Sequence, residues 1–189
     1  MRSVNSTTEA VSYLTEITRS IKDYPRKGIV FRDLTTIFQD RRAMAYAIDL
    51  LAGSISDSNL GDLKYDKFVG IEARGFVLAG ALSSKLGGGV ILARKPDKLP
   101  YLRKRVEYKL EYGEDALEMH EDAIKPGEKV IVIDDLLATG GTAEAACKLV
   151  EELGGEVIKV VFLVELPTLN GRIKLSRYQV DSIISFSGE

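Results

Sequence analysis

Short, continuous apolar runs alternate with longer helical segments along most of this chain. Such runs are typical of parallel strands buried on both faces, with the intervening helices as the cover. The predicted strands lie at 68–71, 90–93, 130–133 and 157–164, and the predicted helices between them lie at 75–86 and 143–153. The pattern therefore predicts an α/β fold with a central, mostly parallel sheet flanked by helices.

The N-terminal quarter has helical spacing instead. Ser6 and Glu9 have the spacing of a capping box, so we expect a first helix to begin after Ser6 and to end before Pro25. A second helix is expected from about Asp40, after a short apolar run at 29–31. The two apolar stripes comprise Val11, Leu14, Ile17 and Ile21 in the first helix, and Ala43, Met44, Ala47, Ile48 and Leu51 in the second.

Between the two strand–helix units, apolar and charged residues alternate one by one from Val106 to Tyr112. A period of two predicts a half-exposed antiparallel strand, and a turn at 113–115 with a return at 117–119 completes an inserted hairpin. Residues 54–62 form a short polar connector that no change of composition follows. We therefore expect residues 1–189 to form a single domain.

Composition and charge restrict the classes of partner. The formal net charge of −2 argues against nucleic acid and anionic membranes as general partners, so an anionic ligand requires a local basic site. The single cysteine, Cys147, permits no intrachain disulfide and no cysteine-based metal cluster. No apolar stretch approaches the roughly 18 residues of a membrane span, and the first residues lack the apolar run of a signal peptide. These features predict a cytoplasmic protein.

The densest chemistry lies between Val130 and Thr142. The strand here ends in Asp134 and Asp135, and ligands of open parallel sheets bind beyond the carboxyl ends of the strands. The next loop offers glycines whose N–H groups can approach an oxyanion, threonine hydroxyls and a helix N-terminus. Two carboxylates beside an anion site make sense when they accept hydrogen bonds from vicinal sugar hydroxyls. The predicted ribose 5-phosphate site comprises Asp134, Asp135, Ala138, Thr139, Gly140, Gly141 and Thr142.

Two other nucleotide sites share parts of this pattern. An apolar strand that ends in two aspartates also resembles the second motif of P-loop NTPases, but the chain has no G-x-x-x-x-G-K-[S/T]. The nearest approach, Gly70 to Gly75, is followed by Phe76. A dinucleotide site requires G-x-G-x-x-G after a strand, which the sequence lacks. An acidic strand end before a capped helix would explain one aspartate and one threonine, but not the whole segment.

Residues 130–142, Val-Ile-Val-Ile-Asp-Asp-Leu-Leu-Ala-Thr-Gly-Gly-Thr, resemble the ribose-phosphate signature of type I phosphoribosyltransferases, in particular of those that use adenine. The similarity extends from about Ile21 to the C-terminus, and it includes residues 28–33, 70–76, 94–96, 98–100 and 110–113. The resemblance implies transfer of a phosphoribosyl group from 5-phosphoribosyl-1-pyrophosphate to adenine, with AMP and pyrophosphate as products. It also implies a homodimer, and Mg²⁺ bound mainly through the substrate rather than in an all-protein metal site.

The resemblance gives roles to four further places in the chain. A hood at about 21–36 covers the base, and a flexible catalytic loop at about 94–108 closes over the donor. Arg74 binds the leaving pyrophosphate through its planar guanidinium, and Glu111 is the acid/base candidate beside the purine. The residues expected around the pyrophosphate and in the lid are Glu72, Ala73, Arg74, Gly75, Arg94, Lys95 and Lys98, and those around the base are Val30, Phe31, Arg32 and Leu166.

These assignments have ordinary structural alternatives. Arg74 could pair with Glu72 at the surface, and Glu111 could be a solvated glutamate. Phe31 and Leu166 could belong to the core.

The basic run at 94–105 also has two interpretations. It contains one acid, Asp97, and could form a solvated face, but its place beside a polyanionic substrate favours a closing lid. Its part 101–105 departs from the more polar and acidic sequence typical of the family. The basic residues are Arg94, Lys95, Lys98, Arg103, Lys104 and Arg105.

Two features bear on the base and on turnover. Members of the family that use 6-oxopurines usually carry a lysine aimed at the 6-oxygen. Lys159 and Lys174 are the C-terminal lysines that could imitate it, and neither has the matching context, which favours adenine. A binding module that senses the same sugar phosphate without turnover would need neither the basic run nor Glu111, so both features favour an enzyme.

Overall fold

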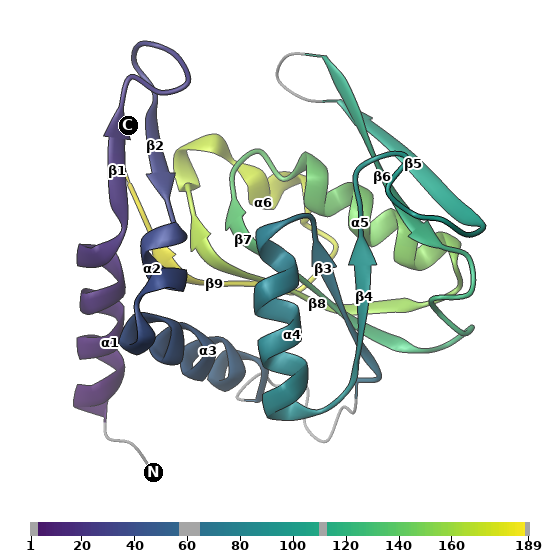
Figure 1. The fold of residues 1–189 in the computed structure, drawn as a ribbon, viewed down its shortest axis with the longest axis horizontal. Coiled ribbons are helices and arrows are strands. Elements are labelled where there is room, and N and C mark those ends of the chain that lie inside the picture. The colour runs from purple at the N-terminus through teal and green to yellow at the C-terminus, as the bar shows by residue number, and fades with distance from the viewer. Residues whose placement is uncertain (1–3, 57–64, 110–112, 188–189) are drawn as a thin grey trace.

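The structure is a computed structural model that describes residues 4–56, 65–109 and 113–187. Within these residues, five strands form a central sheet with the order β4-β3-β7-β8-β9, and every neighbouring pair is parallel (Figure 1). The strands are β3 (Lys67–Ile71), β4 (Gly89–Ala93), β7 (Lys129–Leu137), β8 (Glu156–Glu165) and β9 (Val180–Ser185). The expected α/β fold with a parallel central sheet is confirmed.

Helices cover both faces of the sheet, because successive side chains of a strand point to opposite faces. Along β7, Ile131 and Ile133 pack with α1, α3 and α4, whereas Val130 and Val132 pack with α5 on the other face. All four side chains are fully buried. The covering helices are α1 (Val4–Ile17), α3 (Arg41–Ser56), α4 (Arg74–Leu86) and α5 (Gly141–Glu152), which confirms the helices expected from the pattern.

The first helix ends earlier than expected, because the chain leaves it to form a hairpin. The Thr18 hydroxyl donates to the Leu14 carbonyl at 2.7 Å and closes the last turn. β1 (Arg19–Lys22) then pairs antiparallel with β2 (Val30–Asp33), and the short helix α2 (Thr35–Gln39) follows. Ile21, expected on the helical stripe, instead lies opposite Phe31 in this pair. The expectation for Ile21 is wrong, since pairing with a later strand overrides the local helical spacing.

The inserted hairpin consists of β5 (Arg103–Lys109) and β6 (Glu114–His120), which pair antiparallel. The alternating pattern is thereby confirmed, but β5 begins earlier than the expected Val106. Residues 103–108 of the expected flexible loop therefore lie in a strand. In Figure 1 this hairpin stands at the upper right and the β1–β2 hairpin at the upper left, on either side of the sheet.

The chain returns to the sheet after β8 through elements that the apolar pattern does not predict. These are a 3₁₀ turn, η1 (Pro167–Leu169), the short helix α6 (Gly171–Lys174), and the edge strand β9. β9 includes Asp181 and Ser182, which weaken its apolar alternation. None of the helices in the described ranges has the length and apolarity needed to cross a membrane.

Candidate active site

Parallel pairing of β3 with β7 brings two predicted segments together at the carboxyl edge of the sheet. Residues 72–75 follow β3, while Asp134 and Asp135 lie near the end of β7. Arg74, the first residue of α4, forms an ion pair with Asp135, whose side chain is 5% exposed. Segments far apart in the sequence are thus in direct contact where a ligand was expected.

The two aspartates leave acceptor capacity for a ligand. Apart from the ion pair with Arg74, Asp135 Oδ2 accepts no hydrogen bond from the described residues. Asp134 Oδ1 accepts the Asp135 backbone N–H at 2.9 Å. Burial, followed by the charge of Asp135, raises the pKa of Asp134 well above its ordinary value. Hydroxyl groups that donate to this pair would favour its ionised form.

The loop after β7 forms a backbone cradle. Gly140 has a φ of +79°, and a Cβ atom at this position would lie 2.5 Å from the Gly171 carbonyl oxygen, so only glycine fits. Gly141 then starts α5, and the first N–H groups of a helix have no partner within it. A hollow of about 80 Å³ lies here, lined by Asp134, Phe162 and residues 136–143. A single water needs roughly 10–15 Å³, so the hollow admits a group of several atoms such as a phosphate.

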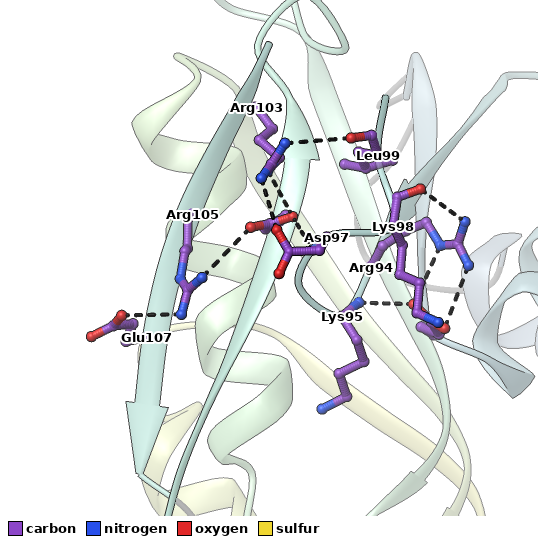
Figure 2. A network of polar contacts seen from close by, with 10 residues as sticks. Arg94, Lys95, Asp97, Lys98, Leu99, Arg103, Arg105 and Glu107 are labelled. Carbon is purple, nitrogen blue, oxygen red and sulfur yellow. Dashed lines mark hydrogen bonds and ion pairs between the residues drawn. The ribbon is translucent and has the colours of Figure 1, made fainter. Parts of the chain in front are cut away.

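Glu72 fixes the loop that precedes α4. Its Oε2 accepts the Lys95 backbone N–H at 2.8 Å and lies 3.3 Å from Arg94 Nε (Figure 2). Burial alone would raise the pKa of Glu72, but the Lys95 N–H, Arg94 and the charge of Lys98 hold it below its ordinary value. Glu72 and Arg74 therefore have other partners, and the surface pair between them that the sequence left open is not formed.

Ala73 and Gly75 complete this loop. Ala73 is the N-cap of α4, and the peptide bond between Glu72 and Ala73 is cis. A Cβ atom on Gly75 would lie 2.7 Å from the Ile133 carbonyl oxygen and 3.2 Å from Asp134 Oδ1. The absence of a side chain at Gly75 therefore lets the start of α4 lie directly against β7.

The basic run of the expected lid has acidic partners in the hairpin. Glu118 on β6, whose side chain is 1% exposed, lies 3.0 Å from Arg103 Nε and accepts the Asp97 N–H at 3.0 Å. Arg105 lies 3.8 Å from the same carboxylate and 3.3 Å from Glu107. Figure 2 labels Arg103, Arg105 and Glu107 among the residues in contact here. The charge of the run is thus partly balanced in this conformation.

Lys95 and Lys98, expected at the pyrophosphate, contact protein atoms here. Lys95 Nζ donates to the Tyr108 hydroxyl at 2.6 Å and pairs with Asp115, which lies opposite Tyr108 in the hairpin. The Lys98 carbonyl accepts a hydrogen bond from Arg94 Nη1 at 3.4 Å. A role of these residues at the pyrophosphate stays a prediction.

Arg32 connects the hood to the C-terminal strand. Its guanidinium lies 4.4 Å from the centre of the Phe186 ring and donates to Ser20 Oγ at 2.5 Å. The Phe186 N–H donates to the Glu165 carbonyl at 3.1 Å, directly before Leu166. Leu166 is half-buried and packs against the core. Arg32 and Leu166 were expected on two sides of the base. They are linked in the structure through Phe186 and Glu165.

Val30 and Phe31 are half-buried on β2. The ring of Phe31 meets that of Tyr24 edge-on, with 5.3 Å between the ring centres. Phe31 is therefore not a plain core residue, and its ring remains available at the hood. Contact of these two residues with a base stays a prediction.

Glu111 lies outside the described residues, so its acid/base role also stays a prediction. The two lysines considered for a 6-oxopurine have other surroundings. Lys159 is fully buried, with Nζ 2.6 Å from the Ser54 carbonyl oxygen and 2.5 Å from the Asp181 carboxylate. Lys174 is exposed on α6. Because Lys159 forms a buried ion pair, it is not available to bind a purine.

Three residues of this region escaped the sequence analysis. Phe162 lines the hollow of the cradle, and Glu118 anchors the lid. Asp33 pairs with Arg19 at 3.3 Å, and its pKa is lowered first by the hydrogen bonds from Thr35 and then by the charges of Arg19 and Arg74. Of the three, only Glu118 could have been predicted from the sequence, because an alternating hairpin places acidic and basic residues opposite one another.

Comparison with known protein families agrees with this geometry. The family model described as the phosphoribosyl transferase domain matches residues 35–188, which include both the cradle and the loop at 72–75. The fold is that of a phosphoribosyltransferase.

Individual relatives define the family more narrowly. An adenine phosphoribosyltransferase of Chelativorans sp. (strain BNC1) is 51% identical over 172 residues, 90% of this chain and 92% of the relative. One from Agrobacterium fabrum is 48% identical over 183 residues, 96% of this chain and 99% of the relative. The chain belongs to the adenine phosphoribosyltransferase family.

Solved structures of the family have the same fold. The adenine phosphoribosyltransferase of Thermoanaerobacter pseudethanolicus superposes with a TM-score of 0.87 at 45% identity, over 93% of this chain and 99% of that one. The Saccharomyces cerevisiae enzyme, solved with an imino-altritol bisphosphate and adenine, gives a TM-score of 0.87 at 34% identity, over 94% of this chain and 99% of that one.

Proposed function

We propose that this chain acts in purine salvage and transfers the 5-phosphoribosyl group of phosphoribosyl pyrophosphate to adenine, with AMP and pyrophosphate as products. The observation that carries the proposal is the pair Asp134–Asp135 directly before the glycine cradle, with Arg74 in contact with it. The complex of the yeast relative with adenine supports the acceptor.

Donor binding would use each part of this site. The cradle and the N-terminus of α5 hold the 5′-phosphate, because their free N–H groups and the helix dipole favour an anion. Asp134 and Asp135 accept hydrogen bonds from the ribose hydroxyls. When the hydroxyls satisfy Asp135, the guanidinium of Arg74 becomes available to the pyrophosphate.

Bond exchange occurs at C1 of the ribose. The bond to pyrophosphate breaks while N9 of adenine approaches, and the transition state resembles an oxocarbenium ion, whose positive charge the two carboxylates stabilise. Adenine loses a proton as N9 forms its new bond, and Glu111 is the proposed acceptor. Arg74 binds the departing pyrophosphate.

Mg²⁺ would neutralise the charge of the pyrophosphate. No cluster of three metal-ligating side chains occurs in the described residues. Hard oxygen ligands suit this ion, so it would be held mainly by substrate oxygens at this site.

The lid would protect the reaction from water. Closure of residues 94–108 over the donor would exclude water, which would otherwise hydrolyse the activated C1. Arg94, Lys95 and Lys98 would then exchange their present protein contacts for contacts with the donor.

The choice of base is tested by turnover of adenine, hypoxanthine and guanine at equal concentration with saturating donor. Adenine presents an amino group at C6 and an acceptor at N1, whereas the 6-oxopurines present a carbonyl and an N–H. A site matched to one pattern leaves groups unpaired with the other and can separate rates by up to about 10⁴-fold. Equal rates with hypoxanthine would refute the acceptor, and no turnover with any base would favour a sensor.

Two further properties belong to the proposal. A donor that carries several phosphate charges does not cross a lipid bilayer unaided, which supports a cytoplasmic location. A homodimer is supported by exposed apolar side chains on α4 and β4, where Val77 is 47% and Leu92 is 40% exposed.

A further inference from the structure

A two-bond fork joins the end of β8 to α6. Arg172 donates to the Glu165 carboxylate through Nε at 2.8 Å and through Nη2 at 2.7 Å. This is the parallel geometry in which arginine and carboxylates bind most strongly. Ser182 Oγ donates to Glu165 at 2.7 Å, and Arg172 Nη1 donates to the Val180 carbonyl at 2.8 Å. The Arg172 hydrogen bond outweighs burial and, with Ser182, holds the pKa of Glu165 below its ordinary value.

The neighbours of the fork contact the ligand segments. The Leu166 N–H donates to the Leu137 carbonyl at 2.9 Å, where β7 passes into the cradle. Gly171 packs directly on the cradle: its carbonyl oxygen would lie 2.5 Å from a Cβ atom on Gly140, and a Cβ atom on Gly171 would overlap the Ala138 carbonyl oxygen. These contacts are backbone on backbone. The position of the cradle therefore depends on where Gly171 is held.

The segment between β8 and β9 has little regular structure to hold it. It contains only η1 and the short helix α6, and a helix this short has almost no stability of its own. Ile173 and Leu169 are 71% and 45% exposed, so they contribute little packing. Leu175 is fully buried and, with the partly buried Tyr178, provides the apolar anchor. Arg172 provides the polar anchor on the side of the segment that faces the cradle.

We propose that Arg172 is a positioning residue for the reaction. Through Glu165 it fixes Gly171 against the cradle that binds the 5′-phosphate, and it fixes Leu166 at the edge of the base site. The inference rests on the proposed function and deepens it. According to this inference, the ion pair between Arg172 and Glu165 controls the affinity for the donor, although Arg172 does not contact the reacting atoms.

Steady-state kinetics of three variants test this role. Arg172→Gln removes the fork, Arg172→Lys restores one charged donor, and Arg177→Gln is the matched control. Arg177 lies in the same stretch, is 60% exposed, and pairs with Glu151 instead. Loss of the fork is expected to raise the KM for phosphoribosyl pyrophosphate about tenfold, with kcat within about twofold of wild type. Arg172→Lys is expected to recover part of the loss, and Arg177→Gln to leave the KM unchanged.

Several outcomes would overturn the proposal. In the first, Arg172→Gln lowers the thermal midpoint while the KM for the donor stays within about twofold of wild type. In the second, Arg177→Gln raises the KM equally. Should Arg172→Gln not fold, Glu165→Gln, which preserves size, carries the same test, and an unchanged KM in it would be decisive against the role.

Calorimetric binding of ribose 5-phosphate separates this proposal from the proposed function, because binding requires no turnover. Weaker binding by Arg172→Gln than by wild type supports the positioning role even if the wild-type chain converts no base. Equal binding by both refutes it, whatever the turnover.

Discussion

Adjacent aspartates at the end of β7 occupy different environments. Asp135 is buried against the guanidinium of Arg74, whereas Asp134 faces the hollow of the cradle and forms no ion pair with another described residue. Burial and the charge of Asp135 raise the pKa of Asp134 well above the ordinary value of 3.8. The empty site therefore destabilises the ionised form of Asp134, a cost that the donor is expected to remove.

Asp134→Asn should make the ligand-free protein more heat-stable, and increasingly so as the pH rises. The folded chain holds the Asp134 proton more tightly than the unfolded chain. This contribution is therefore fully present below pH 3.8 and is lost as the pH rises through the raised folded pKa. Asparagine has no such dependence and keeps the Oδ1 that accepts the Asp135 N–H. Thermal midpoints of both proteins between pH 5 and 8 provide the measurement, and a difference that shrinks with rising pH would contradict the assignment.

Replacing both carboxylates should remove donor binding while the fold remains. Asp134→Asn with Asp135→Asn takes two charge-assisted acceptors from the ribose hydroxyls. At about 1.5 kcal/mol for each hydrogen bond, affinity should fall about 100-fold. Calorimetric titration with donor and Mg²⁺ measures this. Asp122→Asn, on an exposed loop before β7 at the opposite edge of the sheet, is the control and should bind as wild type. Unchanged affinity in the double variant would refute the ribose site.

At the scale of elements, the sequence predicts what is encoded locally. The strands at 68–71 and 130–133 and the helix at 75–86 were predicted because each carries its own apolar period. β1 and β9 were not, because β1 forms by pairing with β2, and β9 adds to an edge of the sheet with polar residues in its run. Their structure is decided by tertiary pairing, which a local pattern does not contain.

The candidate site likewise has a part that the sequence predicts and a part that it does not. The cradle was predicted because its carboxylates, glycines and threonines are contiguous in the sequence. The partners of its neighbours were not, since Glu118, Phe186 and Arg172 reach the site from other elements. The sequence thus identified the groups that are expected to touch the ligand and missed those that hold them in place.

Donor binding should change the accessibility of the whole lid. In the structure Glu118 binds both Arg103 and the Asp97 N–H, and thereby holds the loop to β6. Trypsin should cut after Lys98, Arg103, Lys104 and Arg105 in the empty protein, and donor with Mg²⁺ should slow this cleavage about tenfold or more. Glu118→Gln should accelerate cleavage of the empty protein.

Cleavage after Lys85, which lies in the last turn of α4 and outside the lid, is the internal control for this experiment. Its rate should be the same with and without donor. Equal cleavage of the lid in both states would show that residues 94–105 do not close over the donor.

At the scale of the whole molecule, one edge of the sheet carries three exposed apolar side chains on neighbouring elements. β4 is an edge strand, and its Val90 and Leu92 are 39% and 40% exposed, while Val77 on the neighbouring α4 is 47% exposed. Exposed apolar side chains on an unpaired edge favour association with another chain. The expected homodimer therefore has a candidate surface, defined by Val77, Val90 and Leu92.

Leu92→Glu should convert the homodimer to a monomer, because a charge buried at an interface without a partner costs several kcal/mol. Light scattering coupled to size exclusion measures the mass, and wild type should give twice the 20.8 kDa of the chain. Ile173→Glu is the matched control, since Ile173 is 71% exposed on α6, away from α4 and β4, and should leave the mass unchanged. A wild-type mass of one chain at micromolar concentration would refute the dimer. A dimer that persists in Leu92→Glu would instead move the interface away from β4, because a glutamate at the centre of a packed apolar surface could not be tolerated.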